Sequence, residues 1–273
     1  MSNMTACVNN LTTKVASGQL CKAFGIKLNS NPQVVQLAKN AGFDSLFIDL
    51  EHSTLSISDA SKLSCAGILG GITPFVRVPY KCGDGFVQRV LDGGAMGVVF
   101  PHIHSVDDAK AAVSISKYPP LGHRSMTGQL PIFSFKSIPA SRAIQEGNAF
   151  SSSVILMIET KEGIRNVDEI AAVVGADVVL IGSNDLSINL GVPGDYQSPV
   201  FRSALEAVGA ACRRHGKTMG LAGVYDNYEV QNWAVNTLGV RFMMCQVDSG
   251  LIASGAARCI AAVPKVEESI KEG

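Results

Sequence analysis

Short apolar runs recur at regular intervals along this chain, and their spacing restricts the possible folds more than any other feature. The runs are residues 20–28, 45–50, 73–78, 97–103, 154–160, 177–182, 217–222 and 241–247. Most are continuously apolar rather than alternating, which is typical of strands buried on both faces of a parallel sheet. The pattern therefore predicts eight parallel strands joined by crossover connections.

Helix-start signals stand between the apolar runs. Two gaps carry the Ser-x-x-Asp spacing of a capping box, which begins at Ser56 and at Ser105. The other main starts are expected at Pro32, Asn166, Pro199 and Asp226. Strands and helices thus alternate eight times within 273 residues.

This alternation has the size and order of a (β/α)₈ TIM barrel, which we predict as a single domain over residues 1–273. A doubly wound open sheet is the alternative. Such a sheet more often shows a Gly-rich nucleotide turn after its first strand, and the sequence has none there.

One connection, residues 119–153, is unusually long. It carries no predicted strand, and only SRAIQEGNAF indicates a helix. Because long connections are often functional, its Arg124, Phe133 and Phe135 could cover a pocket. A plain insertion with one helix is the alternative.

Composition excludes several classes of function. Lys+Arg and Asp+Glu number 23 each, and without a basic run a nucleic-acid surface is not expected. No apolar stretch approaches the roughly 18–20 residues of a membrane helix, and MSNMTACVNN does not resemble a signal peptide. The seven cysteines are scattered without a C-x-x-C pair, which favours free thiols in a reducing compartment. We therefore expect a soluble cytoplasmic protein.

Polar residues cluster at the ends of five consecutive predicted strands. In a TIM barrel, the carboxyl ends of all strands meet at one face, and that face holds the active site. The residues concerned are Asp49, Glu51, His52, Arg77, His102, His104, Glu159 and Asp185. Their common position predicts an active site, with capping of helix N-termini as the alternative.

Glu159 and Asp185 follow adjacent strands and carry the hard oxygen ligands that suit Mg²⁺ or a similar ion. A salt bridge to Lys161 or Arg165 is the alternative for this pair. The sequence therefore predicts a two-carboxylate metal site.

Arg77 could donate two bonds from its planar guanidinium to a carboxylate or an enolate oxygen. A structural salt bridge is the alternative. His52, three residues after Asp49, could form an oriented acid–base pair with it, or could be a buried histidine with satisfied hydrogen bonds.

Several motifs resemble those of the HpcH/HpaI-type class II pyruvate aldolases. In family order they are FDSLFIDLEH, VRVPY, LDGGAMGVVFPHIHSVDDA, KYPPLGHR, ILMIETKEGIRNVDEI and VVLIGSNDLSINLG, which span residues 43 to about 195. Weaker matches are GKTMGLAG and QVDSGLI. Macrophomate synthase, which forms pyruvate enolate from oxaloacetate, is similar in the same motifs.

This resemblance implies a (β/α)₈ barrel with an additional N-terminal helix. It also implies a homohexamer, a trimer of dimers, in which the C-terminal helix is exchanged between subunits. A divalent metal, Mg²⁺ or alternatively Mn²⁺ or Co²⁺, would be held by Glu159 and Asp185.

The resemblance also implies roles around that metal. Backbone amides of Ser183, Asn184 and Asp185 would hold the pyruvate carboxylate, and Arg77 would stabilise the enolate oxygen. His52, oriented by Asp49, would transfer protons, while Glu51 matches a family acid. These roles are those of an aldolase site.

The leading hypothesis is a metal-dependent carbon–carbon lyase that acts through pyruvate enolate on a 4-hydroxy-2-oxo acid, with an oxo acid and an aldehyde as its small-molecule partners. An oxaloacetate decarboxylase or an enolate-trapping synthase of the macrophomate synthase type is the first alternative. A non-catalytic binder is the second, because Met157 stands where the family often has Gln. Met157, Asn184, GHRSM and GLAG depart from the family where the second substrate should bind.

Overall fold

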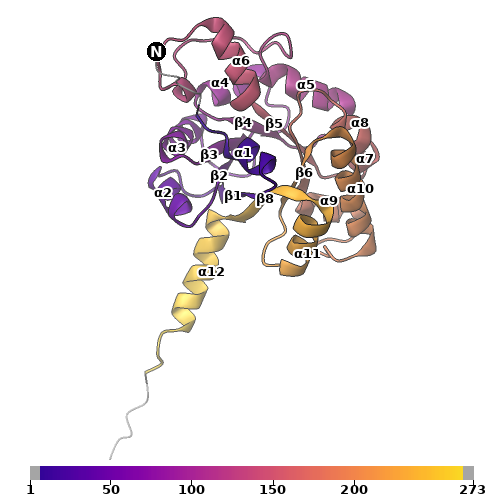
Figure 1. The fold of residues 1–273 in the computed structure, drawn as a ribbon. Coiled ribbons are helices and arrows are strands. Elements are labelled where there is room, and N and C mark those ends of the chain that lie inside the picture. Colours follow the sequence, from indigo (N-terminus) through magenta and orange to yellow (C-terminus); the bar gives the residue numbers. More distant parts are fainter. Residues whose placement is uncertain (1–6, 267–273) are drawn as a thin grey trace, which may run out of the picture.

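Eight parallel strands close into a barrel in the computed structural model, which describes residues 7–266 (Figure 1). The strands follow one another around the barrel in chain order, and each overlaps one predicted apolar run. Their bounds are β1 Cys21–Ile26, β2 Ser45–Asp49, β3 Thr73–Arg77, β4 Gly97–Phe100, β5 Ser153–Ile158, β6 Val178–Gly182, β7 Thr218–Ala222 and β8 Val240–Val247. The predicted TIM barrel is confirmed, and closure of the sheet excludes the doubly wound alternative.

Helices surround the barrel and cover the outer face of the sheet (Figure 1). Their bounds are α1 Asn10–Ala16, α2 Gln33–Asn40, α3 Ile57–Gly70, α4 Asp84–Asp92, α5 Val106–Ser116, α6 Ala140–Phe150, α7 Lys161–Arg165, α8 Val167–Ala171, α9 Ser183–Leu190, α10 Pro199–His215, α11 Tyr228–Trp233 and α12 Asp248–Ala261. Short helical turns lie at Pro131–Phe133 (3₁₀) and Ala234–Leu238 (π).

Most predicted helix starts are confirmed, including both capping boxes, at Ser56 and Ser105. Two predicted caps are wrong. The Asn166 side chain does not cap α8; it donates instead to the backbone carbonyl of His104. The cap of α11 is Asn227 rather than Asp226, because Asp226 has a left-handed backbone, φ 53°, and belongs to the preceding turn.

Two apolar layers explain why the strands are continuously apolar. The inner layer fills the barrel with one set of strand side chains, among them Phe47, Phe75, Met157 and Phe242. The outer layer packs the alternate side chains against the helices. Leu11 of α1 belongs to the inner layer, so this N-terminal helix covers one end of the barrel and leaves the other end for a site.

The long connection of residues 119–153 contains the 3₁₀ turn and α6 but no strand before Ser153, as predicted. Phe133 packs with Met96, which directly precedes β4, and buried Arg124 pairs with Asp92 at 2.7 Å. This connection joins a helix end to a strand start, so it lies at the amino ends of the strands. Phe135 is exposed.

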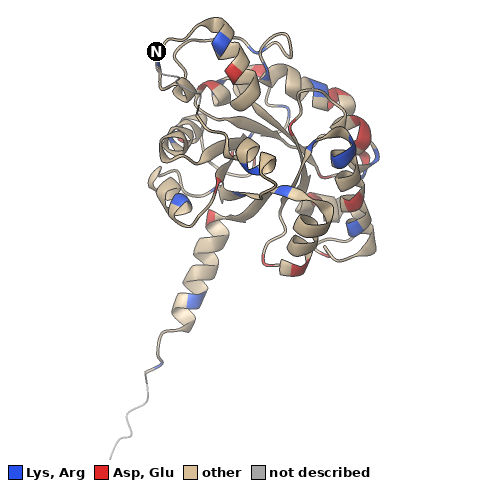
Figure 2. Ribbon diagram, viewed as in Figure 1, with Lys and Arg blue, Asp and Glu red and all other residues tan. Residues whose placement is uncertain are grey.

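Helix α12 projects away from the barrel (Figure 1). Its first residue, Asp248, is buried, whereas Leu251, Ile252 and Ile260 are exposed apolar side chains. Figure 2 shows basic and acidic residues interspersed over the helices in that view, in agreement with the balanced composition. Among the described helices, none is long and apolar enough to cross a membrane.

Candidate active site

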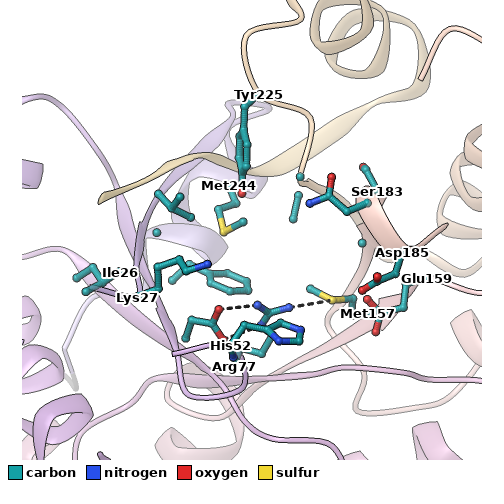
Figure 3. Close-up of a pocket in the computed structure, with 18 residues that line it drawn as sticks. Ile26, Lys27, His52, Arg77, Met157, Glu159, Ser183, Asp185, Tyr225 and Met244 are labelled. Atoms are coloured by element: carbon teal, nitrogen blue, oxygen red, sulfur yellow. Dashed lines mark hydrogen bonds and ion pairs between the residues drawn. The ribbon is translucent and has the colours of Figure 1, made fainter. Parts of the chain in front are cut away.

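A cavity of about 440 Å³ opens at the carboxyl ends of the strands (Figure 3). Every strand except β4 contributes lining residues from its end or from the loop that follows. The sequence-predicted site residues that line it are Asp49, His52, Arg77, Glu159, Ser183, Asn184 and Asp185. None of its lining residues comes from residues 119–153. The hypothesis that this connection covers the pocket of its own subunit is therefore wrong.

The Arg77 guanidinium is fixed by Asp49 on the neighbouring strand. Arg77 Nε and Nη2 donate to the two Asp49 oxygens at 2.9 Å and 2.6 Å, because the sheet register places the two residues side by side. Burial alone would raise the pKa of Asp49, but the bonds and charge of Arg77 outweigh burial and lower it. This bidentate pair leaves Arg77 Nη1 facing Met157, whose Sδ lies 4.0 Å away.

Asp49 also shapes the turn that carries Glu51 and His52. Its Oδ1 accepts the backbone N–H groups of Glu51 at 3.0 Å and of His52 at 3.2 Å. The His52 ring is more than half exposed, and its Nε2 lies 3.7 Å from Glu51 Oε2. Asp49 therefore holds His52 through the backbone, and the acid beside the ring is Glu51 rather than the expected Asp49.

Glu159 is almost fully buried at the end of β5. It accepts the His102 backbone N–H at 2.6 Å, and His102 Nδ1 lies 3.1 Å away. Burial raises its pKa to about 7; the His102 N–H opposes this rise, and the charge of Asp185 adds to it. Within residues 7–266 neither Lys161 nor Arg165 pairs with Glu159 or Asp185, so the salt-bridge alternative is wrong.

The backbone at β6 approaches Glu159 closely. A Cβ at Gly182 would lie 2.6 Å from Glu159 Oε2, so only glycine fits at this position without displacing the carboxylate. Ser183, Asn184 and Asp185 then form the first turn of α9, whose leading N–H groups have no partners within the helix. This turn offers the donors of an anion site directly beside two carboxylates.

Two side chains of this turn have distinct surroundings. Ser183 is fully buried, and its Oγ has no hydrogen-bond partner in the described part of the chain. The Tyr196 hydroxyl, between α9 and α10, donates to Asn184 Oδ1 at 2.5 Å and lies 3.3 Å from the Gly223 carbonyl oxygen in the loop after β7. Ser183 Oγ is thus a buried polar atom available to a ligand.

The lining residues that sequence reasoning missed include Lys27, Tyr225 and Met244. Lys27 directly follows β1, so the same strand-end argument would have found it had the predicted strand ended at Ile26. Tyr225 belongs to the loop after β7, and Met244 lies within β8. No sequence motif marks these two positions.

Comparison with known proteins identifies the family. A model of the HpcH/HpaI aldolase/citrate lyase family matches residues 27–238. The chain belongs to the HpcH/HpaI aldolase/citrate lyase family. The motif resemblance found in the sequence is therefore confirmed.

Two curated members of this family are close relatives. The 4-hydroxy-4-methyl-2-oxoglutarate aldolase cghB of Chaetomium globosum is 58% identical over 97% of this chain and 98% of that protein. The 4-hydroxy-4-methyl-2-oxoglutarate aldolase tasA of Hapsidospora irregularis is 57% identical over the same shares. These relatives confirm that the chain is an aldolase, a carbon–carbon lyase.

Solved structures agree with the family assignment. The HpcH/HpaI aldolase from Desulfitobacterium hafniense matches with a TM-score of 0.88 and 28% identity, covering 96% of this chain and all of that one. Macrophomate synthase matches with a TM-score of 0.73 and 23% identity, covering 94% of this chain and 91% of its own. The second likeness shows the shared fold alone.

Proposed function

We propose that this aldolase cleaves 4-hydroxy-4-methyl-2-oxoglutarate into two molecules of pyruvate. The observation that carries the substrate assignment is the near full-length identity of 58% and 57% to two enzymes with that name. The C3–C4 bond breaks, the C4 hydroxyl loses its proton, and C3 retains the electron pair as pyruvate enolate. The second product is then a keto acid rather than the aldehyde expected from sequence.

A divalent metal, Mg²⁺ or alternatively Mn²⁺ or Co²⁺, would be held by Glu159 and Asp185. The two carboxylates and the unpartnered Ser183 hydroxyl form an oxygen-rich donor set that suits such ions. When bound, the metal supplies Lewis-acid stabilisation of negative charge on the enolate oxygen. No group of three or more His, Cys, Asp or Glu side chains placed to bind a metal occurs in residues 7–266, so we expect modest affinity.

Groups of the protein itself would bind the substrate carboxylate and stabilise the enolate oxygen. The first-turn N–H groups of α9 would bind the carboxylate next to the keto group. Arg77 Nη1, left free of Asp49 by the bidentate pair, would donate to the oxygen that becomes the enolate. Because Asp49 fixes the guanidinium, this donor needs little reorganisation as charge develops.

His52 would act as the base and then as the acid. Its ring lies at the open side of the cavity, with Nε2 3.7 Å from Glu51 Oε2. It would take the C4 hydroxyl proton and deliver a proton to C3 of the enolate. The exposure of its ring allows water to complete that exchange.

A turnover assay tests the proposed function. The purified protein should convert 4-hydroxy-4-methyl-2-oxoglutarate to two pyruvates per molecule, EDTA should abolish this conversion, and added Mg²⁺ or Mn²⁺ should restore it. The readout is pyruvate release, followed beside oxaloacetate under the same conditions. Full turnover in a demonstrably metal-free sample would refute the metal assignment. Faster turnover of oxaloacetate would favour the decarboxylase alternative, and no turnover of either would favour the binder.

Metal affinity should depend on pH through Glu159. Its pKa of about 7 means that roughly one tenth is ionised at pH 6 and nine tenths at pH 8, and only the ionised form binds metal. The apparent affinity for Mg²⁺ should therefore rise about tenfold between pH 6 and pH 8. Calorimetric titration at both pH values measures this change. An affinity that is equal at the two values would show that Glu159 is not the titrating ligand.

Assembly and location belong to the same proposal. We propose one barrel domain that forms a homohexamer by exchange of α12. The exposed Leu251 and Ile252 adjoin an apolar groove that Val34, Leu37 and Phe43 help to line, which supports an interface there. The seven cysteines are all free, which supports the expected cytoplasmic location.

A further inference from the structure

The Lys27 side chain enters the active-site cavity from the side opposite Glu159 and Asp185 (Figure 3). Among residues 7–266, no acidic side chain lies within ion-pair distance of its ammonium group. The nearby carboxylates of Asp49 and Glu51 are engaged with Arg77. Among the described residues, therefore, no acidic side chain forms an ion pair with Lys27. Its ammonium group is suited to bind an anionic ligand in the cavity.

The backbone of Lys27 is held in place by a buried acid. Asp248, only 2% exposed at the start of α12, accepts the N–H groups of Lys27 at 3.1 Å, Leu28 at 3.0 Å and Asn29 at 2.8 Å. These three bonds fix the loop after β1. The position of the lysine at the cavity is thus built into the fold rather than left to a mobile surface loop.

Tyr225 provides a second donor in the same cavity. It reaches the cavity from the loop after β7, with its hydroxyl directed inward near Met244 (Figure 3). Burial raises the pKa of Tyr225 to about 12, so the phenol keeps its proton near neutral pH. The cavity therefore has an acidic side at Glu159 and Asp185 and, away from it, a cation and a neutral O–H donor.

We propose that Lys27, assisted by the Tyr225 hydroxyl, binds the second carboxylate of the substrate, the one carried by the acceptor half. This inference rests on the proposed function, because 4-hydroxy-4-methyl-2-oxoglutarate has a carboxylate at each end. The first carboxylate belongs at the α9 turn, and a desolvated second carboxylate needs its own donors. Lys27 thereby selects a keto acid over a neutral aldehyde or ketone as the acceptor.

The test compares two substrates that differ only in this carboxylate. One is 4-hydroxy-4-methyl-2-oxoglutarate; the other is 4-hydroxy-4-methyl-2-oxopentanoate, which releases acetone instead of the second pyruvate. In Lys27→Met, the ratio of kcat/KM for the first substrate to that for the second should fall roughly 50-fold, mainly through a higher KM for the dicarboxylate. Lys27→Arg should retain most of the ratio, and Tyr225→Phe should lower it roughly fivefold.

Lys22→Met is the matched control. It removes the same charge from an exposed position of β1, five residues before Lys27, that does not line the cavity, so the wild-type ratio should persist. If Lys27→Met fails to fold, Lys27→Gln and Tyr225→Phe provide the same comparison. Thermal melting identifies that case.

Three results would overturn the inference. A wild-type ratio in Lys27→Met, in a preparation whose wild type cleaves the dicarboxylate, would overturn it and leave the proposed function intact. No dicarboxylate cleavage by the wild type would refute the proposed function and the inference together. Borohydride trapping of pyruvate on Lys27, with equal losses for both substrates in Lys27→Met, would make this residue a Schiff-base lysine instead.

Discussion

Replacement of Glu159 by glutamine should lower turnover of 4-hydroxy-4-methyl-2-oxoglutarate by roughly 10³-fold or more, the largest loss expected of any single substitution here. Glutamine keeps the size of the side chain, and its oxygen can still accept the His102 N–H that Glu159 now accepts at 2.6 Å. The local fold should therefore survive. What disappears is the negative charge, and with it one of the two proposed metal ligands.

Two measurements on Glu159→Gln separate chemistry from folding. Steady-state pyruvate release at saturating Mg²⁺ gives the activity, and a Mg²⁺ titration gives the affinity, which should become too weak to measure. Glu162→Gln is the matched control, because it makes the same change at an exposed residue of α7 just beyond β5 and should behave as wild type. Metal binding of wild-type strength in Glu159→Gln would place the metal elsewhere.

The fold could be predicted because its strands are buried on both faces. Inner residues such as Phe47 and outer ones such as Ile48 are both apolar, so each strand is a continuous run that ends where the chain turns. Capping boxes at Ser56 and Ser105 could also be predicted, since they use only residues three apart. The cap at Asn166 failed because its side chain found a distant partner, the His104 carbonyl, which no local pattern reveals.

The site could be predicted in position but not in its pairings. Strand ends of a barrel share a face, so Asp49, Arg77 and Glu159 were expected together and are found together. Whether Asp49 pairs with His52 or Arg77 depends on the β2–β3 register, which places Asp49 beside Arg77 and is invisible in the sequence. Proximity in the sequence favoured a pair between Asp49 and His52. The parallel register of β2 and β3 instead places Asp49 beside Arg77.

Two other errors had causes within reach of sequence reasoning. The connection of residues 119–153 runs from a helix end to a strand start, which places it at the amino ends of the strands, away from the site. Lys27 was taken as part of a strand over residues 20–28, whereas β1 ends at Ile26 and Lys27 opens the loop. A two-residue error in a strand end thus concealed a residue of the cavity.

The conservative substitution Arg77→Lys should lower turnover roughly 10²-fold while leaving Mg²⁺ affinity unchanged. Lysine keeps the positive charge but lacks the planar guanidinium. In the wild type, Nε and Nη2 bind Asp49, whereas Nη1 faces the cavity and lies 3.4 Å from Glu51 Oε2. A single ammonium group cannot hold Asp49 in this bidentate way and also donate to the developing enolate oxygen.

Comparison of kcat with Mg²⁺ affinity in Arg77→Lys identifies the role of Arg77. Loss of kcat with intact metal binding indicates a donor to the transition state, whereas a structural salt bridge would lower thermal stability and metal affinity together. Arg124→Lys is the matched control: Arg124 is also buried and also binds a carboxylate, Asp92, but it lies outside the cavity. The Arg124→Lys variant should have a lower thermal stability than wild type and an unchanged kcat. Turnover of Arg77→Lys within a factor of two of wild type would assign Arg77 a structural role and require another donor for the enolate oxygen.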